Sequence, residues 1–210
     1  MRLTRLPLIA IIFVAMVAWP WNCLADIRTI DFKNFSFPWT PPSDWPDHLQ
    51  WMSLKLKPHV ELVNGRWDER NKARGEQFSG LTLEGVQFAK LSDEEREDAI
   101  VVLRYDSGGT QYHYWVYIYT DLKGTPKLLG ILHTGDRAYH GLYQIFEKDR
   151  TLNVRLFDPK FREGDCYSSG YLTYQFRWNG KGFEATGTPL SGRVNSTSRR
   201  PVSVFGIPTN

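Results

Sequence analysis

DAIVVLRYD, residues 98–106, has apolar side chains at both odd and even positions, so both faces of an extended chain would be hydrophobic. That pattern predicts a central strand that is buried on both sides. The next segment, TQYHYWVYIYT (110–120), is almost wholly aromatic and β-branched, a composition that suits a packed, pleated surface. PKLLGILHT (126–134) follows after a short turn. These segments predict neighbouring strands at the centre of a sheet.

The second half of the chain predicts further strands at GLYQIFE (141–147), TLNVRLFD (151–158) and YLTYQFRW (171–178). Asn179-Gly180 predicts a type I′ hairpin turn after the last of them. Short connections join antiparallel neighbours, so we expect a meander. The expected fold is mainly β: an antiparallel meander that forms a curled sheet, a partly closed barrel or a sandwich. Strands that are apolar on both faces favour a closed sheet over an open sheet with one solvent-exposed face.

The segments on either side of these strands differ from them in composition. Residues 38–58 contain five prolines and three tryptophans, Trp39, Trp45 and Trp51. Because proline suppresses regular ladders, we expect an irregular extended wrap whose tryptophans plug the ends of the core. Residues 188–210 are rich in Ser, Thr, Pro, Gly and Arg, so we expect a flexible C-terminal tail.

The first 25 residues have the pattern of a secretory signal peptide: two arginines, a short apolar run and small residues before Asp26. The apolar run is shorter than the roughly 20 residues of a membrane-spanning helix. We therefore expect a signal peptide at 1–25, a single β-rich domain at 26–187 and no transmembrane segment after cleavage. The expected location is secreted or periplasmic.

The charge balance gives no electrostatic reason to expect a nucleic-acid partner. Residues 1–25 contain two of the 26 basic residues and none of the 23 acidic ones, so cleavage would leave a net charge of +1. Cleavage would also leave Cys166 as the lone cysteine. A lone cysteine in an oxidising compartment is buried, paired between chains or reactive.

Several motifs occur in a consistent order: DFKNFSFPW (31–39), VELVNGRW (60–67), FAKLSDEEREDAIVVL (88–103), TGDRAYHGL (134–142) and YQFRWNGKGF (174–183). In this order they resemble a family of bacterial secreted or periplasmic proteins of uncharacterised function. These proteins open on DFxNFx[YF]PW, continue with VxVxNGxW and carry one loop like those of FG-GAP and VCBS repeats. The resemblance implies a β fold and an extracytoplasmic location, and it brings no catalytic residues.

The chain departs from that family at the loop after residue 88, where related loops offer carboxylates at alternate positions to a hard cation. Here Lys90 occupies the leading position, which disfavours calcium. A weaker alternative keeps a calcium site at Ser92, Glu94 and Asp98. No other cofactor is expected. The family also often has adjacent cysteines where this chain has only Cys166, so the resemblance brings no disulfide to this position.

HTGDRAYHGL (133–142) combines histidines with an aspartate and an arginine. The spacing of His133, Asp136 and His140 matches no standard zinc pattern. Gly135, Asp136 and Arg137 instead predict a structural turn, with the Asp136 side chain bonded to its own backbone.

The remaining candidate is the aromatic segment 110–120, in which His113, Trp115, Tyr117 and Tyr119 share one face. If that face were exposed, it would be a platform for sugar rings or a protein partner. The alternative is that both faces are buried. We therefore expect a non-catalytic binding or structural module for cell-envelope glycan or a secreted protein. The alternative function is a secreted hydrolase that uses Cys166 with a spatially adjacent histidine.

Overall fold

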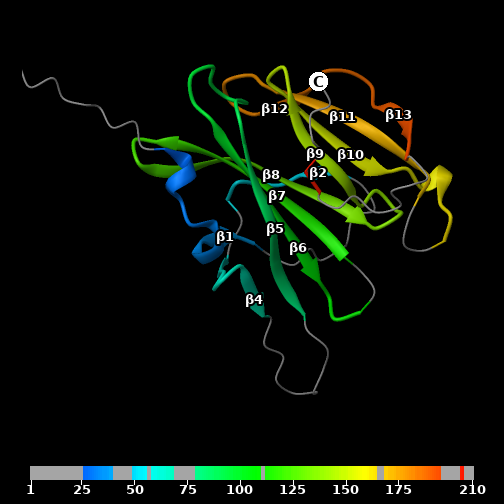
Figure 1. Ribbon diagram of the computed structural model, residues 1–210, viewed down its shortest axis with the longest axis horizontal. Helices are drawn as coiled ribbons and strands as arrows, with labels where there is room; N and C mark the ends of the chain where they lie inside the picture. Colours follow the sequence, from blue (N-terminus) through cyan, green and yellow to red (C-terminus); the bar gives the residue numbers. More distant parts are fainter. Residues whose placement is uncertain are drawn as a thin grey trace, which may run out of the picture.

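The computed structural model describes residues 26–39, 49–55, 58–68, 79–109, 112–164, 168–194 and 204–205. Two antiparallel sheets face each other, and a small third sheet lies at the N-terminal side (Figure 1). The signal peptide expected at 1–25 lies outside the described residues. Within them, no helix is long and apolar enough to cross a membrane.

The first sheet contains the strands that the central sequence predicts. Its six strands lie in the order β2 (Gln50–Trp51), β8 (Thr125–Asp136), β7 (Tyr112–Leu122), β6 (Asp98–Asp106), β5 (Gly80–Ala89) and β4 (Arg66–Asp68). Strands β5 to β8 pair consecutively and antiparallel, so the expected meander is confirmed.

The second sheet continues the chain in the same way. Its path runs β12 (Phe183–Ala185), β11 (Gly170–Trp178), β10 (Thr151–Phe157) and β9 (Leu142–Lys148), and β13 (Leu190–Arg193) also pairs with β11. The small sheet pairs β1 (Ser36–Pro38) with β3 (His59–Glu61). The described residues also form short 3₁₀ helices, η1 (Ile27–Thr29), η2 (Phe32–Asn34) and η3 (Pro159–Phe161). Because β13 pairs with β11, regular structure continues beyond residue 187, where we expected the domain to end.

Two hydrophobic clusters explain why the central strands are apolar on both faces. Along β6, Val101 and Leu103 enter one cluster, while Ile100 and Val102 enter the other. In the first cluster, side chains of the first sheet pack against the N-terminal segments 27–39 and 60–62. In the second cluster, they pack against the inner face of the second sheet. The mainly β antiparallel prediction is therefore confirmed. In the described part of the chain the sheets form a sandwich rather than a closed barrel, because separate layers cover each apolar face.

The N-terminal segment contributes aromatic side chains to the first cluster, as its composition indicated. Trp39 is buried, with its ring centroid 5.2 Å from both Trp67 and Tyr105. The role of a core plug is confirmed for this residue. Trp51 is half-buried in β2, and Trp45 lies outside the described residues.

The turn after β11 differs from the predicted type I′ hairpin. Trp178 pairs with Phe183, so the loop contains residues 179–182 rather than Asn179-Gly180 alone. The Asn179 side-chain oxygen accepts hydrogen bonds from the backbone N–H groups of Lys181 (2.8 Å) and Gly182 (2.9 Å). Gly180 has φ +93°, which glycine adopts without strain. Asn179 and Gly180 are thus turn residues, but of a wider turn that the asparagine side chain organises.

Candidate functional site

The aromatic face of β7 is inside the protein. The expected binding residues His113, Trp115, Tyr117 and Tyr119 have exposed fractions of 1%, 0%, 0% and 4%. A stacking platform needs rings that a ligand can reach. The structure therefore corrects the expectation of an exposed binding face here: the alternative, burial, holds for the face that carries these side chains.

The N-terminal segment covers this face. The Tyr117 hydroxyl donates a hydrogen bond to the carbonyl of Pro38 (3.0 Å), and its ring lies 4.9 Å from that of Phe37. The Phe32 ring lies 5.7 Å from that of Tyr119. These contacts join residues about 80 positions apart, so no local sequence pattern could show them.

Burial raises the pKa of the Tyr117 and Tyr119 hydroxyls above the ordinary value of 10.0. In the unfolded chain both groups ionise near that value, while in the folded protein they stay neutral. Their contribution to stability is therefore complete below pH 10 and is lost as the pH rises through the raised values, by roughly 1.4 kcal/mol per pH unit per group.

We expect the urea midpoint to fall steeply above about pH 10, and the fall to be shallower in Tyr117→Phe. Urea unfolding at a series of alkaline pH values, with phenolate absorbance recorded in parallel, measures this. A midpoint that is flat up to about pH 11, or equally steep in the variant, would contradict the assignment.

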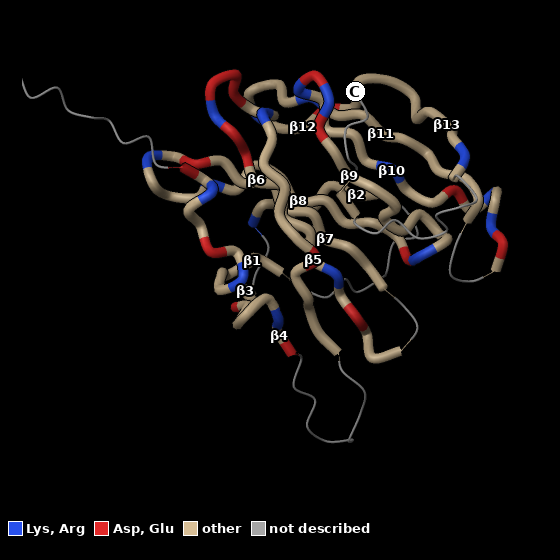
Figure 2. The backbone as a smooth tube through the Cα atoms, in the orientation of Figure 1, with Lys and Arg blue, Asp and Glu red and all other residues tan. Residues whose placement is uncertain are grey.

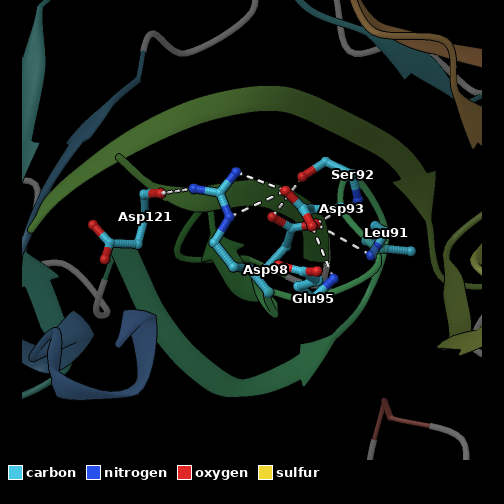
Figure 3. A network of polar contacts seen from close by, with 7 residues as sticks. Leu91, Ser92, Asp93, Glu95, Asp98 and Asp121 are labelled. Atoms are coloured by element: carbon cyan, nitrogen blue, oxygen red, sulfur yellow. Dashed lines mark hydrogen bonds and ion pairs between the residues drawn. The ribbon is translucent and has the colours of Figure 1, made fainter. Parts of the chain in front are cut away.

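The acidic loop between β5 and β6 folds around Asp98, whose side chain is fully buried (Figure 3). One carboxylate oxygen accepts hydrogen bonds from the backbone N–H groups of Leu91 (3.2 Å) and Ser92 (2.6 Å). The other accepts a hydrogen bond from the Ser92 hydroxyl (2.8 Å). Asp98 therefore closes the loop onto the start of its own strand.

A second carboxylate in this loop binds an arginine. The Asp93 side chain accepts hydrogen bonds from the Glu95 backbone N–H (2.8 Å) and from the Arg96 guanidinium (2.7 Å), and Arg96 also donates to the carbonyl of Asp121 (3.2 Å). The pKa of the Asp93 carboxyl is lowered, first by the Glu95 backbone N–H and then by Arg96.

These contacts bear on the calcium alternative at Ser92, Glu94 and Asp98. The Asp98 oxygens face N–H and O–H donors, whereas calcium needs oxygen lone pairs. Glu94 is exposed and pairs with Arg150 from the turn after β9. These contacts therefore do not direct the oxygens of Ser92, Glu94 and Asp98 toward one cation position. In the described ranges, no group of three or more His, Cys, Asp or Glu side chains is placed to hold a metal ion.

The loop after β8 is a turn, as predicted. The Tyr139 N–H donates to the carbonyl of Asp136 (2.7 Å), and Arg137 has φ +41°. One detail is added: the Asp136 carboxylate accepts a hydrogen bond from the Tyr112 N–H (2.7 Å) on β7, and the same oxygen lies 3.8 Å from Nε of Arg137 in its own loop. Gly135, Asp136 and Arg137 therefore have the expected structural role, and the aspartate ties the turn to the neighbouring strand.

The hydrolase alternative needs Cys166 near a histidine. Cys166 lies outside the described residues. The rings of His113 and His133 stack 5.3 Å apart, and the ring of His133 lies 4.5 Å from that of Trp115, inside the first sheet.

The outer face of the second sheet is the surface that sequence analysis did not select. In β10, Leu152, Val154 and Leu156 point inward, so the alternate residues point outward. Strand register and ring contacts place the following residues on this outer face: Tyr143, Gln144, Phe146, Lys148, Thr151, Asn153, Arg155, Phe157, Tyr171, Thr173, Gln175 and Arg177. Tyr143, Thr151, Asn153, Phe157 and Thr173 are buried, and the others are half-buried or exposed. The set combines aromatic, amide and basic side chains and contains no carboxylate.

Arg155 lies at the centre of this outer face. Its guanidinium carbon is 4.8 Å from the ring centroids of both Phe146 and Tyr171, and it donates a hydrogen bond to the Gln144 side chain (2.9 Å). The rings of Tyr171 and Tyr143 stack 5.4 Å apart. Phe146, Arg155 and Tyr171 are half-buried, so each keeps an exposed part. We call these three residues the aromatic–arginine row.

Two neighbouring hydrogen-bonded pairs extend the polar part of this face. The Gln175 amide donates a hydrogen bond to the Asn153 side-chain oxygen (3.0 Å), and Arg177 donates to the Thr151 hydroxyl (2.9 Å). Strands β9, β10 and β11 contain one acidic residue, Glu147, and Figure 2 shows acidic residues gathered in the loop between β5 and β6. The sequence signal was the alternation in 151–158, which put Asn153 and Arg155 on the face opposite the aliphatic residues.

The described residues thus define an antiparallel two-sheet sandwich with an aromatic, amide-rich and basic outer face. Comparisons with protein-family models, with curated proteins and with solved structures found no match for this chain.

Proposed function

We propose that the protein is a non-catalytic, extracytoplasmic binding module that takes cell-envelope glycan on the outer face of its second sheet. The observation that carries the proposal is the aromatic–arginine row, in which Arg155 lies between the rings of Phe146 and Tyr171. Sugar rings present apolar C–H faces that pack on aromatic rings, and their hydroxyls pair with guanidinium and amide groups. The signal-like residues 1–25 support the extracytoplasmic location.

The charge of this face favours glycans that carry carboxylate or phosphate groups. Its β9–β11 positions include Lys148, Arg155 and Arg177 and no acidic residue. Glu184 of β12, opposite Arg177, adds a negative charge beside them. Basic groups attract an anionic ligand and align it over the rings.

Isothermal titration with an acidic polysaccharide, a phosphorylated oligosaccharide and neutral dextran tests the proposal. We expect binding of an anionic glycan, and a loss of about tenfold or more in affinity in Tyr171→Ala and in Phe146→Ala. Phe88→Ala is the matched control, because Phe88 is a half-buried ring on β5 of the other sheet.

Circular dichroism confirms that each variant is folded before titration. Unchanged affinity in both outer-face variants would contradict the proposed surface. An absence of binding to every glycan tested would contradict the proposed function.

A further inference from the structure

Residues Val204 and Phe205, far from β9 in sequence, lie along its free edge; they form the short red segment beside β9 in Figure 1. The Ile145 N–H donates to the carbonyl of Val204 (2.7 Å), and Ile145 and Phe205 form a parallel bridge. Strand β9 is the last strand of the second sheet, and its other edge pairs with β10. Its outer edge therefore offers backbone groups to an added strand.

The Phe205 ring reaches across to the first sheet and lies against Gly85 of β5. A Cβ atom at Gly85 would be 2.8 Å from the ring carbon Cε2 of Phe205, closer than side chains tolerate. Gly85 lies where the pairing of β5 with β6 shifts register. The missing side chain and the irregular strand together leave a hole that the ring fills.

The opposite side of the sandwich is closed in a similar way. There Trp51 and Phe183 lie over Gly130 of β8, and the two rings stack 5.3 Å apart. Trp51 and Phe183 belong to strands β2 and β12, which pair with their sheets at several positions. Val204 and Phe205 pair with β9 at one bridge, and both side chains also pack against the second hydrophobic cluster.

We infer that the groove between the β9 edge and Gly85 is a binding site for an extended peptide with an aromatic side chain. Its occupant in this structure is the chain's own Val204–Phe205. Backbone hydrogen bonds from β9 supply affinity that is independent of sequence, and the hole at Gly85 selects the aromatic ring. This site lies at the edge of the second sheet and is separate from the proposed glycan surface.

The test uses a labelled peptide that copies residues 199–210 and the full chain carrying Phe205→Ala. Removing the resident ring frees the hole, so we expect this variant to bind the peptide at least about tenfold more tightly than the unsubstituted protein does. A peptide with alanine in place of its phenylalanine is the matched control and should not bind. Equal affinity of the two proteins, or of the two peptides, would overturn the inference.

Gly85→Ala gives a second test with Phe205 retained. The added methyl group should displace the ring, so we expect faster amide hydrogen exchange at Ile145 and no binding of the peptide. The amide of Val154, which lies inside the second sheet, should exchange at an unchanged rate. Unchanged protection at Ile145 in Gly85→Ala would also overturn the inference.

Discussion

Trp115→Ala is expected to lower the free energy of unfolding by about 3–5 kcal/mol, because it opens a large cavity that cannot collapse. Trp115 lies on β7 between β6 and β8 and is fully buried. Its ring is 4.5 Å from that of His133 and 6.3 Å from that of Trp39. Small proteins are stable by about 5–15 kcal/mol, so this single change would remove a large share of the total.

Two variants control the interpretation of that result. Leu122→Ala, at the other end of the same strand, removes a side chain that is 51% exposed and should change stability by no more than about 0.5 kcal/mol. Trp115→Phe keeps an aromatic ring and removes an indole N–H that has no hydrogen-bond partner in the described part of the chain. It should cost less than half as much as the alanine variant. Urea unfolding measures all three, and equal losses in Trp115→Ala and Leu122→Ala would contradict the buried position.

Gly141→Ala is expected to cost about 3 kcal/mol or more, because the new methyl group would collide with backbone atoms. Its Cβ would be 2.4 Å from both the N and the O of Arg137. The turn cannot easily move away: the Gly141 N–H donates to that same Arg137 oxygen (2.9 Å), and the Phe157 N–H donates to the Gly141 carbonyl (3.0 Å).

Gly182→Ala is the matched control. No heavy atom lies within 4 Å of a Cβ at Gly182, so the substitution should be neutral or slightly stabilising. Thermal unfolding of the two variants side by side makes the comparison. If Gly141→Ala melted at the same temperature as Gly182→Ala, the tight packing of the turn would be refuted.

The candidate sites show where sequence reasoning was incomplete. The acids of residues 92–98 suggested a weak calcium site, but the sequence does not show that Asp98 turns inward to accept N–H and O–H donors. Strand β5 was not among the predicted strands, since Glu84 and Gly85 interrupt its alternation. The outer face of the second sheet was passed over because its residues are spread over three strands and come together only through register.

The sequence by itself determined six of the strands, β6 to β11, and their antiparallel character. Alternating and continuous apolar runs specify strands locally, and short connections force antiparallel neighbours; the prediction for 98–106 coincides with β6. Only the tertiary structure decided which surfaces are buried. Both faces of β7 are hydrophobic, and what covers one of them is a segment that precedes Tyr117 by about 80 residues. Burial at that separation depends on packing between layers, which no local pattern encodes.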